Sequence, residues 1–349
     1  MPSLTPERLR AIAADLLEAA GAPRDEAETV ARHCIEANLA GHDSHGIIQI
    51  PSYVDRIEKG HIVPGAKYEI TQESPTTTVV DAHWGFGYVQ TERAMRATIE
   101  KAKTQNVAAC TIFRQGHVGR VAAYPLMAAA EGMIGLMTAD SGRSAKQVAP
   151  FGGREARLGT NPMSIAVPSN LDGPLFFDLS TAAAAAGKIK LAEARGEHVP
   201  EGWLIGADGL PTTDPKVLGN GGALLPLGGN VGFKGYALSA MVEILSALLT
   251  GLGFGVEPTG RHNDGCFIAC FKVDAFRSLD TFKQEVTEFA AYLKDTKPAA
   301  GFDEIYYPGE IEHVRKQERL KTGIQIEDAT WNRLGALAEK LGLPTLQSA

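Results

Sequence analysis

Apolar side chains recur at the spacing of a helix face in three stretches before residue 61. The first stretch begins with Thr5 and Pro6, which predict the start of a helix. Its apolar positions would share one face: Leu9, Ile12, Ala13, Leu16 and Leu17. A second helix is expected over about residues 25–40, ended by Gly41. The third follows the polar run 41–46, with Ser44 as its predicted N-cap, Pro51 in its first turns and Gly60 at its end.

From about residue 75 the pattern changes to short runs rich in β-branched residues, which are typical of strands. The predicted strands cover residues 76–80, 107–113, 133–138, 163–167, 175–179 and 266–273. Helical patterns at 90–105 and 235–249 lie between them. This alternation predicts a sheet covered by helices, in the α/β class.

The pattern is again helical near the end of the chain, at residues 309–321 and 326–341. We therefore expect residues 1–75 and 300–349 to form one helical domain, with residues 76–299 as an α/β domain between them.

Charge and composition exclude several classes of partner. The 34 basic and 41 acidic residues give a net charge of −7 without a basic block, so a nucleic-acid partner is not expected. Charges at Glu7, Arg8 and Arg10 argue against an export signal. The long apolar segment 235–256 contains Glu243, which favours a buried helix over a membrane span. A cytoplasmic protein without a membrane partner is expected.

The four cysteines are too few for a disulfide framework. Cys266 and Cys270 have no second ligand pair for zinc, so we expect buried thiols and no metal. The glycine fingerprint of a doubly wound dinucleotide-binding sheet is also missing. The run GLGFG at 251–255 follows a helix and has the wrong spacing, so it is interpreted as a helix-ending turn.

The densest polar cluster runs from His42 to Gly46, between two helical patterns. His45 at a helix start could exchange a proton with a carbonyl or hydroxyl group near neutral pH. The alternative is a capping sequence in which Asp43 or Ser44 bonds backbone amides. A metal site begun by His42 and His45 lacks a third ligand at a telling spacing.

A second polar cluster, residues 114–120, follows a predicted strand and precedes a helix. Ligands bind at the carboxyl ends of strands in α/β sheets, so His117 is another candidate acid or base. Arg120 offers a planar fork for a carboxylate or phosphate. The alternative is a solvated loop with surface arginines. Lys188 and Lys234 are further cations near glycines, and each is more often a surface residue than a ligand.

Seven motifs in chain order resemble the type-2 malate/L-lactate dehydrogenase family. They are GHDSHGIIQIPSYVDRIEKGHIVPGA (41–66), GHVGR (116–120), PFGGREARLGTNPMSIAVP (150–168), FFDLSTAAAAAGKIKLA (176–192), VPEGWLIGADGLPTTDP (199–215), GFKGYAL (232–238) and YYPGE (306–310). The resemblance covers nearly the whole chain and looks closest to the hydroxycarboxylate dehydrogenase B branch.

The resemblance implies a sulfolactate dehydrogenase-like fold, with a mixed-sheet nucleotide-binding domain in place of a Rossmann fold. It implies a homodimer that uses NAD or NADP and acts on a small 2-oxo or 2-hydroxy acid. Carried over by position, the cofactor contacts are His45, Gly119, Arg120, Val121, Phe176, Phe177, Asp178, Leu179, Ser180, Thr181, Phe233, Lys234, Asp264, Gly309, Glu310, Ile311 and Glu312.

The chain departs from the family pattern at two of these motifs. Family members commonly carry histidine where Phe233 stands. Most carry an arginine, expected to bind the substrate carboxylate, where Gln49 stands. Glutamine cannot supply that charge-assisted bond, so Arg120 is the expected replacement.

The expected reaction is hydride transfer between NAD(P)H and C2 of a 2-oxo acid, with a histidine protonating the carbonyl oxygen. His45 is the favoured proton donor, Ser44 would orient the substrate or the cofactor amide, and His117 is the alternative donor. Tyr53, one turn beyond Gln49, would contact the substrate side chain. Two other functions stay open: reduction of a cyclic imino acid, and a binding protein without catalysis.

Overall fold

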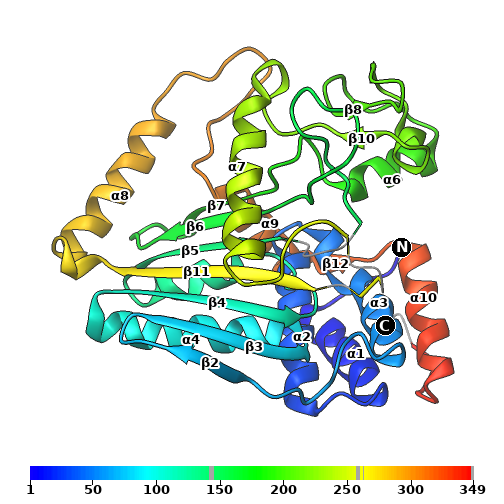
Figure 1. The fold of residues 1–349 in the computed structure, drawn as a ribbon, viewed down its shortest axis with the longest axis horizontal. Helices are drawn as coiled ribbons and strands as arrows, with labels where there is room; N and C mark the ends of the chain where they lie inside the picture. Colours follow the sequence, from blue (N-terminus) through cyan, green and yellow to red (C-terminus); the bar gives the residue numbers. More distant parts are fainter. Residues whose placement is uncertain (141–144, 257–259, 262, 347–349) are drawn as a thin grey trace.

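A seven-stranded mixed sheet forms the centre of the computed structural model, which describes residues 1–140, 145–256, 260–261 and 263–346 (Figure 1). The strands, in spatial order, are β2 (Glu69–Glu73), β3 (Thr77–Gly85), β4 (Val107–Gln115), β11 (Asp264–Lys272), β5 (Met133–Ala139), β6 (Met163–Val167) and β7 (Leu175–Leu179). β3 and β4 are parallel, and the other neighbouring pairs of this sheet are antiparallel. The predicted mixed α/β sheet is confirmed.

Helices cover both faces of the sheet. On one face, α4 (Gly87–Gln105) connects the parallel strands and packs on β4 and β11, while α5 (Ala123–Ala130) packs on β5 and β6. Buried residues between the sheet and these helices form a hydrophobic core that includes Val80, Met95, Ile112, Met137 and Ile268. The other face is crossed by α7 (Phe233–Glu243), which continues as the π-helix η5 (Ile244–Leu248) (Figure 1).

The two ends of the chain lie together in a layer of helices beside the sheet (Figure 1). These helices are α1 (Pro6–Ala19), α2 (Arg24–Leu39), α3 (Ile50–Glu58), α9 (Glu310–Thr322) and α10 (Asp328–Lys340). Strand β1 (Ser3–Leu4) pairs with β12 (Ile324–Gln325), and one hydrophobic cluster contains both Leu9 and Leu334. The same cluster extends to Tyr88 of α4. The division at residues 75 and 300 stays a prediction.

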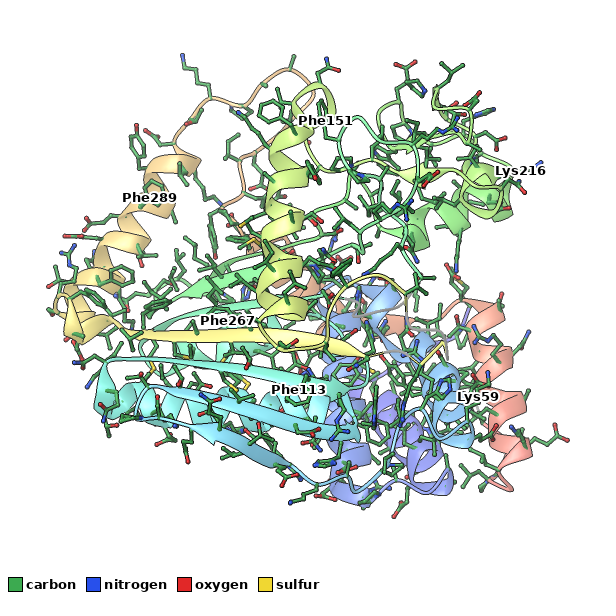
Figure 2. The ribbon with its side chains drawn as sticks, viewed as in Figure 1. Lys59, Phe113, Phe151, Lys216, Phe267 and Phe289 are labelled. Carbon is green, nitrogen blue, oxygen red and sulfur yellow. The ribbon has the colours of Figure 1, made fainter. Side chains whose placement is uncertain are left out.

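A small lobe lies beyond β7, and the sequence analysis did not predict it. It contains α6 (Ala186–Arg195) and a three-stranded sheet with the order β10 (Ala223–Leu224), β8 (Leu204–Ile205) and β9 (Pro211–Thr212). Val148, Ile189 and Leu204 belong to its own hydrophobic cluster. Helix α8 (Leu279–Lys294) was also not predicted; it lies at the outer edge, with Phe289 on its surface (Figure 2).

The predicted start of the first helix is confirmed, since the Thr5 hydroxyl accepts a hydrogen bond from the amide of Arg8. The predicted N-cap at Ser44 is wrong. Residues Asp43–His45 form the 3₁₀ turn η1, Ile47–Gln49 form η2, and α3 starts at Ile50 with Pro51 in its first turn. The side chain of Asn38 accepts from the amide of Ile47 at 2.9 Å, so a tertiary contact replaces the local cap.

The segment predicted as a buried helix is only half covered in this structure. Met241 is 52% exposed and Leu249 57%, whereas Val242 and Ala247 of the same segment are buried. The reason is that α7 and η5 lie flat on the sheet and turn a second apolar face outward. No helix among the described residues combines the length and hydropathy needed to cross a bilayer. All four cysteines are buried and unpaired with one another, as predicted.

Candidate active site

One edge of the sheet gathers the polar residues that follow or precede its strands. The antiparallel register places Asp264, at the start of β11, opposite Gln115, at the end of β4. Asp178 lies near the end of β7, at the same edge. The carboxylate of Asp264 accepts a hydrogen bond from the amide of Val118 at 3.1 Å, which fixes the loop that carries His117.

His45 and His117 meet face to face at this edge. Their ring centroids are 5.6 Å apart with an interplanar angle of 22°. His45 comes from η1 in the helical layer, and His117 from the loop after β4. The two polar clusters predicted separately from the sequence therefore form one site.

The turn that carries His45 is held by polar side chains on two helices. Asn38 of α2 donates to the carboxylate of Asp43 at 2.7 Å. Arg319 of α9 donates to the same carboxylate with two nitrogens, at 2.7 and 3.0 Å. Gly46 passes so close to Asn38 that an added Cβ would lie 2.2 Å from its side-chain oxygen. These contacts explain why the segment does not continue as a helix.

His45 itself has a local partner and a perturbed titration. Its Nδ1 atom lies 3.0 Å from the hydroxyl of Ser44. Burial lowers the pKa of His45, and the nearby carboxylates of Asp178 and Asp264 only partly oppose this effect. A neutral imidazole is therefore the stable form near neutral pH.

His117 is hydrogen-bonded to one buried phenol, which is in turn bonded to a second. The hydroxyl of Tyr53 lies 2.7 Å from His117 Nδ1 and 2.9 Å from the hydroxyl of Tyr88. The Cys34 thiol reaches the Tyr88 hydroxyl at 3.7 Å. Tyr53 and Tyr88 are 1% and 2% exposed, and burial raises the pKa of each well above its ordinary value. Both side chains consequently remain protonated phenols.

Arg120 places a buried cation close to the two histidines. Its side chain is 10% exposed, its Nε lies 3.8 Å from Asp178 Oδ2, and its guanidinium carbon lies 5.0 Å from the centroid of the Phe176 ring. Nε and Nη2 are buried without a hydrogen-bond partner among the described residues. Burial lowers the pKa of Arg120, and the charge of Asp178 opposes that change. Buried guanidinium donors of this kind fit an anionic ligand.

Gly119 and Gly309 allow close backbone packing around this cation. Gly119 has a φ of 70°, and a Cβ there would lie 2.2 Å from the Tyr88 ring. Gly309, before α9, has a φ of 96°, and a Cβ there would lie 2.5 Å from the carbonyl oxygen of Pro174. Only glycine fits either position without displacing its neighbours.

Several residues expected to bind a cofactor have protein partners. Glu310 pairs with Lys294 and accepts from the amide of Tyr307. Glu312 lies 3.5 Å from His42, and this contact lowers its pKa. The Ser180 hydroxyl donates to the carbonyl of Thr160, while Asp178 accepts from the amide of Ala122.

The remaining expected contacts differ in exposure. Val121 and Thr181 are buried, and the Thr181 hydroxyl donates to the carbonyl of Asn161. Ile311 is 43% exposed. Phe177 and Leu179 are half-buried on β7.

Residues Phe233 and Lys234 are exposed on the first turn of α7. Phe233 packs against Phe151, with ring centroids 5.9 Å apart. Figure 2 shows Phe151 beside the start of α7. Lys188 is exposed on α6.

The side chain of Gln49 is joined to the loop of His45. Its amide nitrogen donates to the backbone carbonyl of Ser44 at 2.7 Å. The glutamine at the family arginine position is thus bonded to the residue next to His45, although it is uncharged.

Sequence reasoning missed a buried ion pair at the same sheet edge. Lys146 and Glu243 are 4% and 9% exposed and 3.1 Å apart, and Asn161 donates to the second oxygen of Glu243 at 2.9 Å. It also missed Tyr88 and Cys34, because an aromatic residue and a thiol at helical spacing indicate only a core position. Among the described residues, no group of three or more His, Cys, Asp or Glu could hold a metal ion.

Comparison with known proteins agrees with this arrangement. The family model described as malate/L-lactate dehydrogenase matches residues 4–335. An L-lactate dehydrogenase of Cupriavidus necator is 37% identical, over 96% of each chain. Hydroxycarboxylate dehydrogenase B of Escherichia coli is 36% identical, over 94% of this chain and 92% of its own. These nearly equal identities do not single out one branch.

The crystal structure of a malate dehydrogenase from Entamoeba histolytica superposes with a TM-score of 0.94. It is 33% identical and the match covers 99% of both chains. The mixed sheet is a feature that the family resemblance predicted, and it agrees with the missing Rossmann fingerprint in the sequence. On the family model and these full-length relatives, this chain belongs to the malate/L-lactate dehydrogenase family.

Proposed function

We propose that the protein transfers a hydride between a nicotinamide cofactor and C2 of a small 2-oxo or 2-hydroxy carboxylic acid. The single observation that carries the proposal is the stacked pair His45–His117 beside the buried cation Arg120. An imidazole can move the proton of the alcohol, and a guanidinium can hold the carboxylate of the same substrate. Family membership supports the same reaction class.

His117 is the proposed proton carrier. A general base works best when a third group orients it, and Tyr53 orients His117 at 2.7 Å from inside the protein. The partner of His45 is the hydroxyl of Ser44, an exposed residue. In oxidation, His117 takes the hydroxyl proton of the substrate; in reduction, the imidazolium returns it to the carbonyl oxygen.

His45 is proposed to act as a neutral hydrogen-bonding neighbour of the reacting carbon. Burial already favours its uncharged form, so it would add little repulsion when His117 becomes an imidazolium. This assignment reverses the order of preference that the sequence alone suggests. Ser44 would orient His45 through its Nδ1 atom.

The residues around Arg120 fit a cofactor that carries phosphates. Two buried nitrogens of Arg120 have no hydrogen-bond partner among the described residues, so they can donate to an anion. The backbone at Gly119 and Gly309 is packed so closely that neither position has room for a larger side chain. NAD or NADP would be held between the loop after β4, the end of β7 and the start of α9. When bound, the nicotinamide supplies or accepts the hydride. The residues of this chain then orient the substrate and manage its proton.

Arg120 is also the proposed replacement for the family arginine at position 49. Gln49 and Arg120 approach His45 from the helical layer and from the sheet edge, respectively. Arg120 in that role would keep 2-oxo acids as substrates while presenting the carboxylate from a different direction. The side chains accepted at C2 would change accordingly.

A homodimer is proposed from the outer face of α7 and η5. Met241, Ile244, Leu248 and Leu249 are each at least 42% exposed and follow one another along this surface. A second copy would bury this face, as most soluble assemblies do with such patches. The proposed location is the cytoplasm.

A turnover screen tests the proposed function. Aliphatic and aromatic 2-oxo acids and cyclic imino acids are each offered with NADH and NADPH, and nicotinamide absorbance is followed. We expect turnover of at least one oxo acid. Turnover of imines alone would replace the proposal by C=N reduction. If there is no turnover and neither cofactor shifts the melting temperature at millimolar concentration, the chain is a binding protein of another kind.

A further inference from the structure

We infer that Tyr53 is a positioning residue that keeps the proton of neutral His117 on Nδ1, so that Nε2 exchanges the proton with the substrate. This inference rests on the proposed function and assigns a role to one more residue of the same site. It also changes the role that the sequence predicts for Tyr53, which is contact with the substrate side chain.

Tyr53 is too deeply buried to contact the substrate directly. The side chain is 1% exposed, and its hydroxyl is joined to His117 Nδ1 at 2.7 Å and to Tyr88 at 2.9 Å. Its ring packs against the rings of the same two residues. Among the described residues, the hydrogen bonds of this hydroxyl therefore lead to the histidine and to Tyr88 in the core.

The loop that carries His117 is held through both backbone polar groups of the next residue, Val118. Asp264 accepts from the amide of Val118, and the hydroxyl of Tyr124 donates to the carbonyl of Val118 at 2.7 Å. The ring is thereby held with Nδ1 toward α3. Among the described residues, titratable groups near His117 come from four elements: His45 from η1, Tyr53 from α3, Tyr88 from α4 and Asp264 from β11.

The role of His117 as a base requires one particular tautomer of its neutral ring. A base that acts through Nε2 needs a lone pair there, so the proton of the neutral ring must lie on Nδ1. In the proposed arrangement, Nδ1–H donates a hydrogen bond to the oxygen of Tyr53, and the hydroxyl of Tyr53 donates a hydrogen bond to the oxygen of Tyr88. The partner of one ring nitrogen sets the state of the other. Because both tyrosines stay phenols, the same bond serves His117 when it becomes an imidazolium.

The test compares Tyr53→Phe with Tyr68→Phe. Both substitutions remove one buried phenol oxygen, but the hydroxyl of Tyr68 has no hydrogen-bond partner among the described residues. Protein with ¹⁵N-labelled histidine rings is studied by NMR, and the His117 signals are assigned by their loss in His117→Gln. The pH profile of kcat/KM for oxidation of the best hydroxy acid is measured in parallel.

We expect the Nδ1–H tautomer in the wild type and in Tyr68→Phe, and a shift toward Nε2–H in Tyr53→Phe. The plateau of kcat/KM should fall about 10-fold or more in Tyr53→Phe, a part of what a general base contributes. The acidic limb of its profile should move to lower pH, because the imidazolium has lost its acceptor. Tyr88→Phe, which keeps the Tyr53–His117 bond, should show smaller changes in the same direction.

Two results would overturn the inference: an unchanged tautomer and pH limb in Tyr53→Phe, or a limb moved to higher pH, which would mean that Tyr53 donates to Nδ1. If Tyr53→Phe fails to fold, the wild-type tautomer and the Tyr88→Phe profile decide. A tautomer change without turnover of any hydroxy acid in the wild type would support the role of Tyr53 toward the ring and contradict the proposed function.

Discussion

The side-chain amide of Gln49 donates to the backbone carbonyl of Ser44 at 2.7 Å, so the residue at the family arginine position is tied to the loop that carries His45. In Gln49→Arg a second guanidinium would stand beside the histidine pair. We expect a lower KM for 2-oxo acids and a changed ranking of substrates, since a charge-assisted bond becomes available. The measurement is kcat/KM over a panel of oxo acids. Gln49→Met, which keeps the length without charge, is the control, and an identical ranking in Gln49→Arg and the wild type would contradict the prediction.

Arg120→Gln should weaken binding of the anionic ligand that Arg120 holds. We expect KM for the oxo acid to rise roughly 10- to 100-fold, because hydrogen bonds to charged groups are worth about 1.5–3 kcal/mol. KM values for substrate and cofactor are determined separately. A rise confined to the cofactor would assign Arg120 to its phosphates. Arg120→Lys, which keeps the charge but not the fork, should recover only part of the loss.

His117→Gln and His45→Gln should differ in rate and in pH dependence. Loss of the proton carrier in His117→Gln should lower kcat/KM by about 10² to 10⁴ and remove the acidic limb of the profile. His45→Gln should lower the rate less and keep the limb. If the limb disappears only in His45→Gln, the roles of the two histidines are exchanged.

The lowered pKa of His45 should make the protein less stable in acid. Its folded pKa is lowered by burial, while in the unfolded chain it has the ordinary value of roughly 6.5. Between these two values the unfolded state binds a proton that the folded state does not, so stability falls as pH drops through that window. The free energy of unfolding in urea, measured from pH 8 to 5, should fall less steeply in His45→Gln. Parallel curves for the two proteins would refute this.

The outer face of α7 and η5 should be buried between two copies. Ile244→Glu places a charge on this face and should convert a dimer into a monomer, as judged by light scattering after size-exclusion chromatography. Ile70→Glu, on the edge strand β2 at the other side of the sheet, carries the same change at a similarly exposed position and should leave the mass unchanged. A wild-type protein that elutes as a monomer would reject the proposed interface.

The sequence predicted those parts of the site that lie where strands and helices end. Polar residues such as His45 and His117 are easily recognised between apolar runs. Ligands bind at the carboxyl ends of strands in α/β sheets, so the loop after β4 is a predicted binding position. The residues bonded to the two rings, Ser44 and Tyr53, are named by the sequence analysis, but Tyr88 and Cys34 behind Tyr53 are not, because they occupy ordinary core positions on their helices. Their hydrogen bonds form only when the helical layer packs against α4, and a pattern of neighbouring residues in the sequence cannot predict such contacts.

The missed fold elements have a similar explanation. Strand β2 is largely exposed and lacks the alternation that a half-buried strand shows. Strands β8, β9 and β10 each have 2 residues, too few for any periodicity. Ser44 has the composition of a cap, yet Asn38 competes successfully for the backbone amide of Ile47. Tertiary contacts outweighed local preference at that turn.

The pairing of Ser3–Leu4 with Ile324–Gln325 has a consequence for biosynthesis. On the ribosome, the first helices emerge long before the segment that closes their core. The contacts that Arg319 and the last helix make with this part of the fold are therefore available only after both have been synthesised. In a nascent chain that does not yet contain residue 319, the carboxylate of Asp43 lacks the guanidinium that holds the turn of His45.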